Sequence, residues 1–372
     1  MKPYTLISAA SLFLIFSFNT KPLAQEMQMP CDILEDEVLE KIAPDTVELI
    51  TAFIPAQTIE RVPPRYPRRA AKAGAEGWVQ MSYVIDTQGK VQDAVVEDFG
   101  GHQTFKRAAL KAIEKWTFSP AIKDGEPTEQ CHQAVQFNFT LNGNNGASKR
   151  FISRYKEADE LIKAKDFAGA QAIIAKLHEN KDLNRYENSW LWNIDATLAN
   201  ELGNIKREIK SINRTLASSE SHVDDNKTFD DAYIGFLYSR LFGLEAQAGR
   251  FGAALKTLEA IKELPDAELY LKAIDKTVTQ LTEFLASDQH LFVKVDLQNS
   301  GRYFHELARN KFAFANINGK VDTVEVRCET RRERFTVAED FVWSIPASWG
   351  ECRVMVKGDS QTTFELVEIS NI

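Results

Sequence analysis

The chain has 372 residues, of which 44% are hydrophobic and 26% are charged, and its formal net charge is −8. This composition is typical of a folded protein, and the length is too great for one ordinary hydrophobic core, so we expect two or three domains. An acidic balance argues against nucleic-acid binding, which requires a broad basic surface. Basic residues gather only locally, at Arg61, Arg65, Arg68, Arg69 and Lys72.

The first 24 residues have the pattern of an export signal. Lys2 gives a positive start, and the apolar run 6–18 is shorter than the roughly 20 residues of a membrane-spanning helix. We therefore predict a cleaved signal peptide over 1–24, with an uncleaved single-pass anchor as the alternative. Residues 25–62 form a separate amino-terminal segment, in which 34–42 has the pattern of a short acidic helix.

Export decides how the four cysteines are interpreted. In an oxidising compartment an even number of cysteines favours disulfide bonds. Cys328 and Cys352 lie in one β-rich region, which leaves Cys31 and Cys131 to join the amino-terminal segment to the module that follows it. A metal site at Cys131-His132 is the alternative, but no Cys-x-x-Cys motif and no second ligand cluster supports it. We predict no metal and no cofactor.

Residues 63–142 are the most informative part of the chain. The first strand has an apolar residue at every second position, at Val79, Met81, Tyr83 and Ile85. A turn at 87–90 leads to a return strand at 91–99, and residues 105–116 have the spacing of an amphipathic helix. A last strand of period two covers 135–141. The pattern predicts a β-β-α-β unit in which one helix covers a small sheet.

The remaining residues divide into a helical region and a β-rich region. Residues 148–286 contain two similar helix joints, at 165–170 and 249–254, with a weaker third copy at 203–205. These joints resemble those of tetratricopeptide-like helical hairpins, with an ordinary antiparallel bundle as the alternative. Residues 288–372 contain four strand-like runs and favour an antiparallel β-sandwich. The overall prediction is a multidomain α+β protein.

The 63–142 block resembles the carboxy-terminal domain of the TonB family of energy transducers. The markers are Tyr66-Pro67, Glu76-Gly77, Asp86, Gly89-Lys90-Val91, Phe105, Ala109, Trp116-Thr117-Phe118-Ser119-Pro120 and the terminal strand. The resemblance implies a periplasmic module that binds the TonB box of an outer-membrane receptor in TonB-dependent transmembrane transport. It also implies an inner-membrane proton-channel complex as a further partner. A homodimer and a location in the inner membrane are alternatives that remain open.

Two segments would contact the receptor if this resemblance holds. The last strand would accept the peptide by β-augmentation along Ala134, Val135, Gln136, Phe137, Asn138, Phe139 and Thr140. The family's Tyr-Pro-x-Arg segment matches Tyr66, Pro67 and Arg69, with Arg65 adding charge, and an arginine can bind a carboxylate with two hydrogen bonds. The alternatives are a strand edge covered by the amino-terminal segment or by a second copy, and a basic stretch that is merely solvated.

The chain departs from this family in three ways. No histidine lies between Leu6 and Phe18, a long proline-rich spacer is missing, and more than 200 residues follow the module. The sequence has no Gly-x-Ser-x-Gly, no His-Glu-x-x-His and no phosphate-binding glycine loop, so we predict that it is not an enzyme. The alternative function is a periplasmic scaffold or adaptor whose helices bind other proteins without energy transduction.

Overall fold

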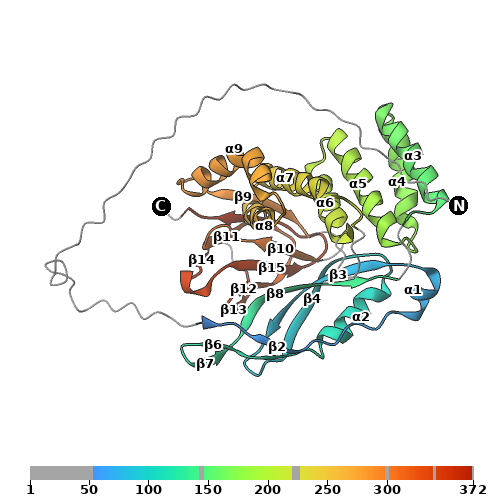
Figure 1. The fold of residues 1–372 in the computed structure, drawn as a ribbon. Helices are drawn as coiled ribbons and strands as arrows, with labels where there is room; N and C mark the ends of the chain where they lie inside the picture. The colour runs from blue at the N-terminus through green and yellow to red at the C-terminus, as the bar shows by residue number, and fades with distance from the viewer. Residues whose placement is uncertain (1–52, 142–145, 220–226, 298–300, 338–340, 371–372) are drawn as a thin grey trace, which may run out of the picture. The chain divides into compact units, whose positions relative to one another are not determined.

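The computed structural model describes residues 53–141, 146–219, 227–297, 301–337 and 341–370 (Figure 1). They belong to one compact unit, Thr51–Ile372. The helix predicted at 34–42 lies outside the described residues. Within them, no helix is both long enough and apolar enough to cross a membrane. Helices and antiparallel sheets are both present, as the α+β prediction requires.

The first module is built on a three-stranded antiparallel sheet. Its strands are β3 (Gly77–Ile85), β4 (Val91–Gly100) and β8 (Gln130–Phe139), in the order β4-β3-β8. Helix α2 (Thr104–Ile113) covers one face of this sheet (Figure 1). The alternation predicted for the first strand is confirmed, because its four apolar residues share one core with α2, at Val79, Met81, Tyr83, Ile85, Phe105 and Ala109.

Several short elements of this module are absent from the predicted β-β-α-β pattern. They are β1 (Phe53–Ile54), β2 (Gln57–Glu60), α1 (Arg68–Ala73), β5 (Thr117–Ser119), β6 (Ala121–Lys123) and β7 (Glu126–Thr128). Strand β2 pairs with β5, and β6 lies between β1 and β7. Strands of two to four residues and a helix of six carry too few positions to show a periodicity, so the sequence pattern did not reveal them.

The helix predicted over 105–116 ends earlier, at Ile113. Trp116 lies beyond it in a tight turn, in which the Trp116 N–H donates to the Ile113 carbonyl at 3.0 Å. The indole is still buried, and its Nε1–H donates to the Val62 carbonyl at 2.9 Å. A buried indole needs such an acceptor, and continuing the helix would not place it there. The prediction was therefore right about the burial of Trp116 and wrong about the end of the helix.

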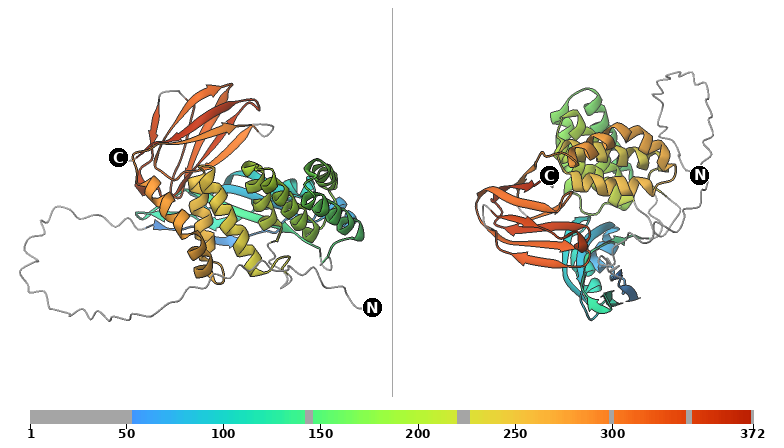
Figure 2. Two further views of the ribbon diagram at one scale, coloured as in Figure 1. Left: turned by 90° about the horizontal axis from the view of Figure 1, so that it is seen from above. Right: turned by 90° about the vertical axis from the view of Figure 1, so that its left-hand side faces the viewer.

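The helical region consists of consecutive helices that pack against one another in chain order (Figure 2). They are α3 (Lys149–Lys163), α4 (Phe167–Glu179), α5 (Arg185–Glu201), α6 (Ile205–Ser219), α7 (Asp231–Gln247), α8 (Phe251–Lys262) and α9 (Ala267–Leu285). Side chains of Ser148, Asp166, Asn184 and Asp230 accept backbone N–H groups in the first turns of α3, α4, α5 and α7. These caps explain where the helices begin.

The three joints singled out in the sequence have the same turn geometry. Each places one residue at positive φ, namely Lys165 at 61°, Gly203 at 63° and Gly249 at 68°. In each joint the next N–H donates to the carbonyl five residues earlier, as in the pairs Asp166–Leu161, Asn204–Ala199 and Arg250–Glu245. This is the Schellman arrangement, which ends a helix with a left-handed residue. The sequence likeness of the joints is thus a likeness of turns.

Replacing Lys165 with glycine is expected to raise the free energy of unfolding by about 0.5–1 kcal/mol. A side chain at positive φ is strained, and the two equivalent positions already hold glycine. Gly203→Ala is expected to lower the same quantity by about 1 kcal/mol. Urea unfolding followed by circular dichroism measures both. A destabilised Lys165→Gly variant would contradict the equivalence of the joints.

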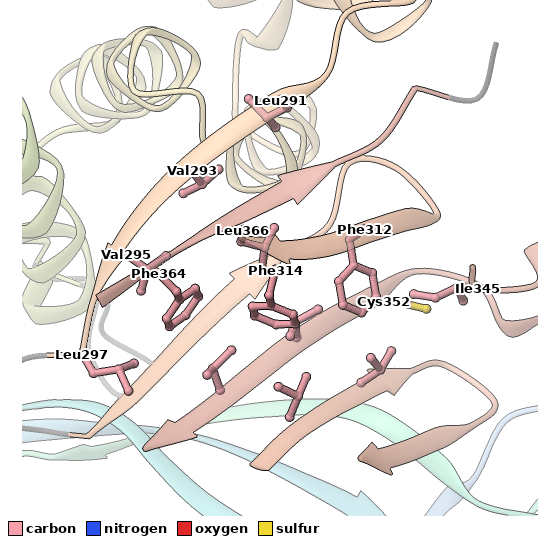
Figure 3. Packing of buried hydrophobic residues seen from close by; sticks show 14 of the residues in the cluster. Leu291, Val293, Val295, Leu297, Phe312, Phe314, Ile345, Cys352, Phe364 and Leu366 are labelled. Atoms are coloured by element: carbon pink, nitrogen blue, oxygen red, sulfur yellow. The ribbon is translucent and has the colours of Figure 1, made fainter. Parts of the chain in front are cut away.

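The last part of the described chain forms two four-stranded antiparallel sheets, ordered β10-β15-β12-β13 and β14-β11-β16-β9. Their strands are β9 (Leu291–Asp296), β10 (Arg302–Glu306), β11 (Lys311–Asn318), β12 (Val321–Cys328), β13 (Arg332–Phe335), β14 (Val342–Ser344), β15 (Cys352–Gly358) and β16 (Thr363–Glu368). Apolar side chains of both sheets, including Phe312, Phe314 and Leu366, form one shared core (Figure 3). The predicted disulfide Cys328–Cys352 joins register partners of β12 and β15.

Candidate functional site

Strand β8 lies at the border of its sheet. It pairs with β3 from Gln130 to Phe139, and within the described residues no second strand pairs with its other side between Gln133 and Phe139. The beginning of β8 is engaged, because the Cys131 N–H donates to the Glu329 carbonyl at 3.2 Å. The border predicted to accept a peptide is therefore closed at one end, and its longer part carries no strand partner in the described chain.

The aromatic residues of β8 hold the strand in the core. Phe139 stacks on Phe105 with a centroid distance of 4.3 Å, and Phe137 meets the Trp116 ring edge-on at 5.2 Å. Both phenylalanines are buried, as the alternation predicted. The strand ends at Phe139, however, so Thr140 and Leu141 lie beyond it, contrary to the predicted range. Anchored in this way, β8 presents its backbone rather than its large side chains at the border.

The face of the sheet opposite α2 carries polar side chains that contact α6. The Gln136 amide donates to the Ala217 carbonyl at 3.0 Å, and the Trp78 indole donates to the Ser218 hydroxyl at 2.9 Å. Both partners are in the last turn of α6. Trp78 is 1% exposed. This face therefore packs against the helical region. The one sign of this packing in the sequence is Trp78, a large apolar residue that does not fall on the core-facing positions of β3.

Tyr66 places the Tyr-Pro-x-Arg segment beside the end of β8. Its ring meets the Phe105 and Phe139 rings edge-on at 5.7 and 5.8 Å, and its hydroxyl donates to the Ala75 carbonyl at 2.6 Å. Burial, with a smaller contribution from the negative charge of Glu76, raises the pKa of the Tyr66 hydroxyl. Pro67 precedes the first turn of α1, where Arg69 is exposed. The two predicted contact segments are thus adjacent.

Arg65 is exposed as well, and Arg68 shares the first turn of α1 with Arg69. Within the described residues, none of these three arginines forms an ion pair, whereas many other arginines of the chain do. An exposed guanidinium without a carboxylate partner is available to bind one from another molecule. The geometry therefore agrees with the predicted chemistry of the segment and leaves its partner unspecified.

Glu76 connects the module to the helical region, a role that the sequence analysis missed. Its side chain is nearly fully buried, and its two carboxylate oxygens accept the Leu141 N–H at 2.5 Å and the Arg185 N–H at 2.8 Å. Arg185 is the first residue of α5, where a carboxylate is favoured by the helix dipole. The next residue must be glycine, because a Cβ at Gly77 would lie 2.2 Å from the Gly100 carbonyl oxygen. The Glu-Gly marker thus has a structural cause.

Ion pairs connect three acidic residues of β4 to other parts of the chain. The pairs are Asp93–Arg332, Glu97–Arg353 and Asp98–Arg214. Arg353 is buried and binds both carboxylate oxygens of Glu97. Burial alone would raise the pKa of Asp93, but hydrogen bonding to Arg332 and its positive charge lower it. These acids were not singled out from the sequence alone, since a sequence does not show which arginines meet them.

The potential metal ligands among the described residues are not clustered. No group of three potential metal ligands occurs there. A cavity of about 600 Å³ lies beside His132, Lys256 and Glu306. Although burial would raise the pKa of Glu306, its neighbours His132, Arg353 and Lys256 lower it, so the carboxylate stays ionised and makes a poor proton donor. This cavity gives no support to an enzymatic reaction.

Cys131 is buried, and within the described residues it has no cysteine partner. Burial, reinforced by the nearby charge of Glu129, raises the pKa of the Cys131 thiol to about 12. A thiol with such a pKa is a weak nucleophile at neutral pH. The predicted partner Cys31 lies outside the described residues, so the Cys31–Cys131 disulfide stays a prediction.

Comparison with known proteins identifies the first module. Residues 62–141 match the family described as Gram-negative bacterial TonB protein C-terminal. This segment is a TonB C-terminal domain. The resemblance inferred from the Tyr-Pro, Glu-Gly and Trp-Thr-Phe-Ser-Pro markers is thereby confirmed for this domain.

Several known proteins are similar to this chain over about 80 residues. Protein TonB of Vibrio cholerae is 38% identical over 84 residues, which are 22% of this chain and 34% of that protein. Protein TonB of Xanthomonas campestris is 34% identical over 80 residues, 22% of this chain and 35% of that protein. Protein tonB2 of Pseudomonas aeruginosa is 33% identical over 79 residues, 21% of this chain and 29% of that protein. The chain thus spans about a third of the length of these relatives.

Proposed function

We propose that this chain is a periplasmic protein that docks outer-membrane receptors by taking a TonB-box peptide onto strand β8, in TonB-dependent transmembrane transport. The observation that supports this is the border of β8, which has no second strand partner between Gln133 and Phe139 within the described residues. An extended peptide would continue the sheet there through backbone hydrogen bonds.

The surroundings of β8 limit the length of such a peptide. The border from Gln133 to Phe139 would accommodate roughly seven residues, about 24 Å of antiparallel strand. Glu329 bounds it at the Cys131 end, and Tyr66 marks the opposite end. In this proposal the peptide pairs with the backbone of β8 from Gln133 to Phe139, and Thr140 follows directly after the paired segment. Arg65 and Arg69 then bind carboxylates of the receptor outside the paired segment.

The peptide itself provides the sharpest test. We expect a synthetic TonB-box peptide to bind the chain beginning at Gln25. Two series of peptides are then compared, one N-methylated at the odd positions and one at the even positions. Only one of the two series is expected to lose binding. N-methylation removes a backbone donor, and only every second N–H of an added strand points at β8. Isothermal titration calorimetry measures the affinity. Equal affinities of both N-methylated series would contradict strand addition.

A variant of the protein tests the same border from the other side. Asn138→Pro is expected to abolish peptide binding, because proline disturbs the strand, whereas Asn138→Ala leaves the backbone unchanged. Circular dichroism and unfolding curves are compared so that a misfolded proline variant is recognised. Loss of binding in Asn138→Ala would instead assign the interaction to the side chain and would argue against backbone pairing.

A scaffold function is the second candidate, supported by aromatic residues on the helices. Ring contacts run from Tyr155 through Trp190 to Phe229, and from there through Tyr233 to Phe236, which is 55% exposed. The Trp190 indole N–H has no acceptor among the described residues. In this alternative the tetratricopeptide-like hairpins bind a protein partner without energy transduction. If the Phe236→Ser variant still captured every protein that the unchanged chain captures, the scaffold function would be contradicted.

The wider arrangement belongs to the same proposal. A signal peptide over 1–24 would deliver the chain to the periplasm. The domains would comprise 63–142, a helical-repeat domain over 148–286 and a β-sandwich over 288–372. The proposed role is non-enzymatic and requires no cofactor. An inner-membrane proton-channel complex and a second copy of the chain are the further partners that the TonB likeness suggests.

A further inference from the structure

The helix layer of the TonB domain carries a charge opposite to that of the whole chain. Residues 61–75 contain five basic residues and no acidic one, while residues 104–115 contain four basic residues and one acidic one, Glu114. The formal net charge of the chain is −8. This layer is therefore a concentrated positive region on an acidic protein.

These two segments lie side by side on the sheet. The Trp116 indole, just after α2, donates to the Val62 carbonyl at 2.9 Å, and the Phe105 ring, near the start of α2, meets the Tyr66 ring at 5.7 Å. Ala70 of α1 is buried in the same core as Phe105. The chain from 62 to 66 thus runs along α2 in the opposite direction, and α1 follows this segment and lies beside α2 in Figure 1. Their basic side chains form one surface, which we call the basic layer.

The basic layer comprises Arg61, Arg65, Arg68, Arg69, Lys72, Lys106, Arg107, Lys111 and Lys115. All of these except the half-buried Lys106 are exposed, and within the described residues none forms an ion pair. The acids on the opposite face of the same sheet, Asp93, Glu97 and Asp98, are each paired with an arginine. One face of the domain is thus neutralised within the chain, whereas the other is not.

We propose that the basic layer binds the anionic phosphate headgroups of a lipid bilayer. The charge is spread over two neighbouring segments, which suits many phosphates on a surface rather than one carboxylate in a pocket. Ile59, two residues before Arg61, is 70% exposed and can enter the headgroup region. Arg65 and Arg69 are shared with the proposed receptor docking, but the inference goes beyond it, because the basic residues of α2 have no part in the β8 border.

The test uses vesicles and the chain beginning at Gln25, which keeps every described residue and removes the apolar run of the amino terminus. The chain is expected to sediment with vesicles of phosphatidylglycerol and phosphatidylcholine but not with phosphatidylcholine alone. Raising NaCl from about 0.05 to about 0.5 M is expected to release it, because salt screens exposed charges. Sedimentation with neutral vesicles at the same level would overturn the inference.

A triple variant, Arg107→Gln, Lys111→Gln and Lys115→Gln, locates the binding surface on α2. Its partition onto anionic vesicles is expected to fall by on the order of a hundredfold, since each basic residue near such a surface contributes a factor of about five. The matched control is Lys149→Gln, Lys272→Gln and Lys276→Gln, which removes the same charge from exposed positions on α3 and α9. The control is expected to bind as the unchanged chain does.

The outcomes separate this inference from peptide docking and from an acidic protein partner. The α2 variant should keep its affinity for the TonB-box peptide, so either proposal can fail alone. Equal losses in the α2 variant and in the control would assign binding to net charge and overturn the inference. Binding to poly-glutamate without binding to anionic vesicles would also overturn it, in favour of an acidic polypeptide.

Discussion

Replacing Glu76 with alanine is expected to lower the free energy of unfolding by roughly 3–5 kcal/mol. The Glu76 carboxylate is nearly fully buried and accepts two backbone N–H groups, from Leu141 and Arg185. Alanine leaves both donors without an acceptor, and a buried unpaired donor costs about 1–3 kcal/mol. Because the donors belong to the end of the TonB domain and the start of α5, we also expect the two regions to unfold separately. Urea unfolding followed by tryptophan fluorescence measures both effects.

Two variants serve as controls for this result. Glu76→Gln keeps one acceptor oxygen and replaces the other with an amide group that cannot accept, so an intermediate loss is expected. Glu114→Ala changes an exposed glutamate on the same domain and should alter the free energy of unfolding by less than about 0.5 kcal/mol. If Glu76→Ala behaves like Glu114→Ala, the carboxylate does not connect the two regions.

Patterns that repeat over several residues predicted the fold well. The alternation predicted the core residues of both strands, such as Met81 in β3 and Phe137 and Phe139 in β8. The helix joints were recognised by the aromatic residue and the small residue three places after it, at Phe167 and Ala170 and at Phe251 and Ala254, whereas their left-handed turn geometry was not predicted. Short ribbons such as β1 and β7 were missed, since two or three residues have no period.

The candidate site was predicted only in part, because its long-range contacts leave no local pattern. Glu325 and Arg327 alternate with the core valines of β12, so a period-two interpretation places them in water. They are instead 1% and 2% exposed, and Arg327 donates to the Asp93 carbonyl at 3.2 Å. A sequence shows that a strand face is charged. It does not show whether water or another part of the chain neutralises the charge.

The second large effect is expected at Arg353, where Arg353→Met should lower the free energy of unfolding by roughly 3 kcal/mol or more. The buried guanidinium binds both oxygens of Glu97 and lies 3.4 Å from a Glu306 oxygen. Although burial would lower the pKa of Arg353, the charges of Glu97 and Glu306 raise it, so the residue is charged when folded. Methionine fills similar space but leaves the partly buried Glu97 carboxylate against an apolar group.

A double-mutant cycle with Glu97→Gln separates the pair from its surroundings. If the Glu97–Arg353 contact holds the TonB domain against β15, Glu97→Gln should cost about 2 kcal/mol in the unchanged chain and much less once Arg353 is methionine. Arg331→Met is the matched control, because Arg331 is exposed and lies 3.7 Å from the exposed Glu333, an arrangement that contributes little. Equal costs of Glu97→Gln in both backgrounds would show no coupling. The TonB domain and the sheet of β15 would then be held together by other contacts, such as the hydrogen bond from the Cys131 N–H to the Glu329 carbonyl and the Asp93–Arg332 ion pair.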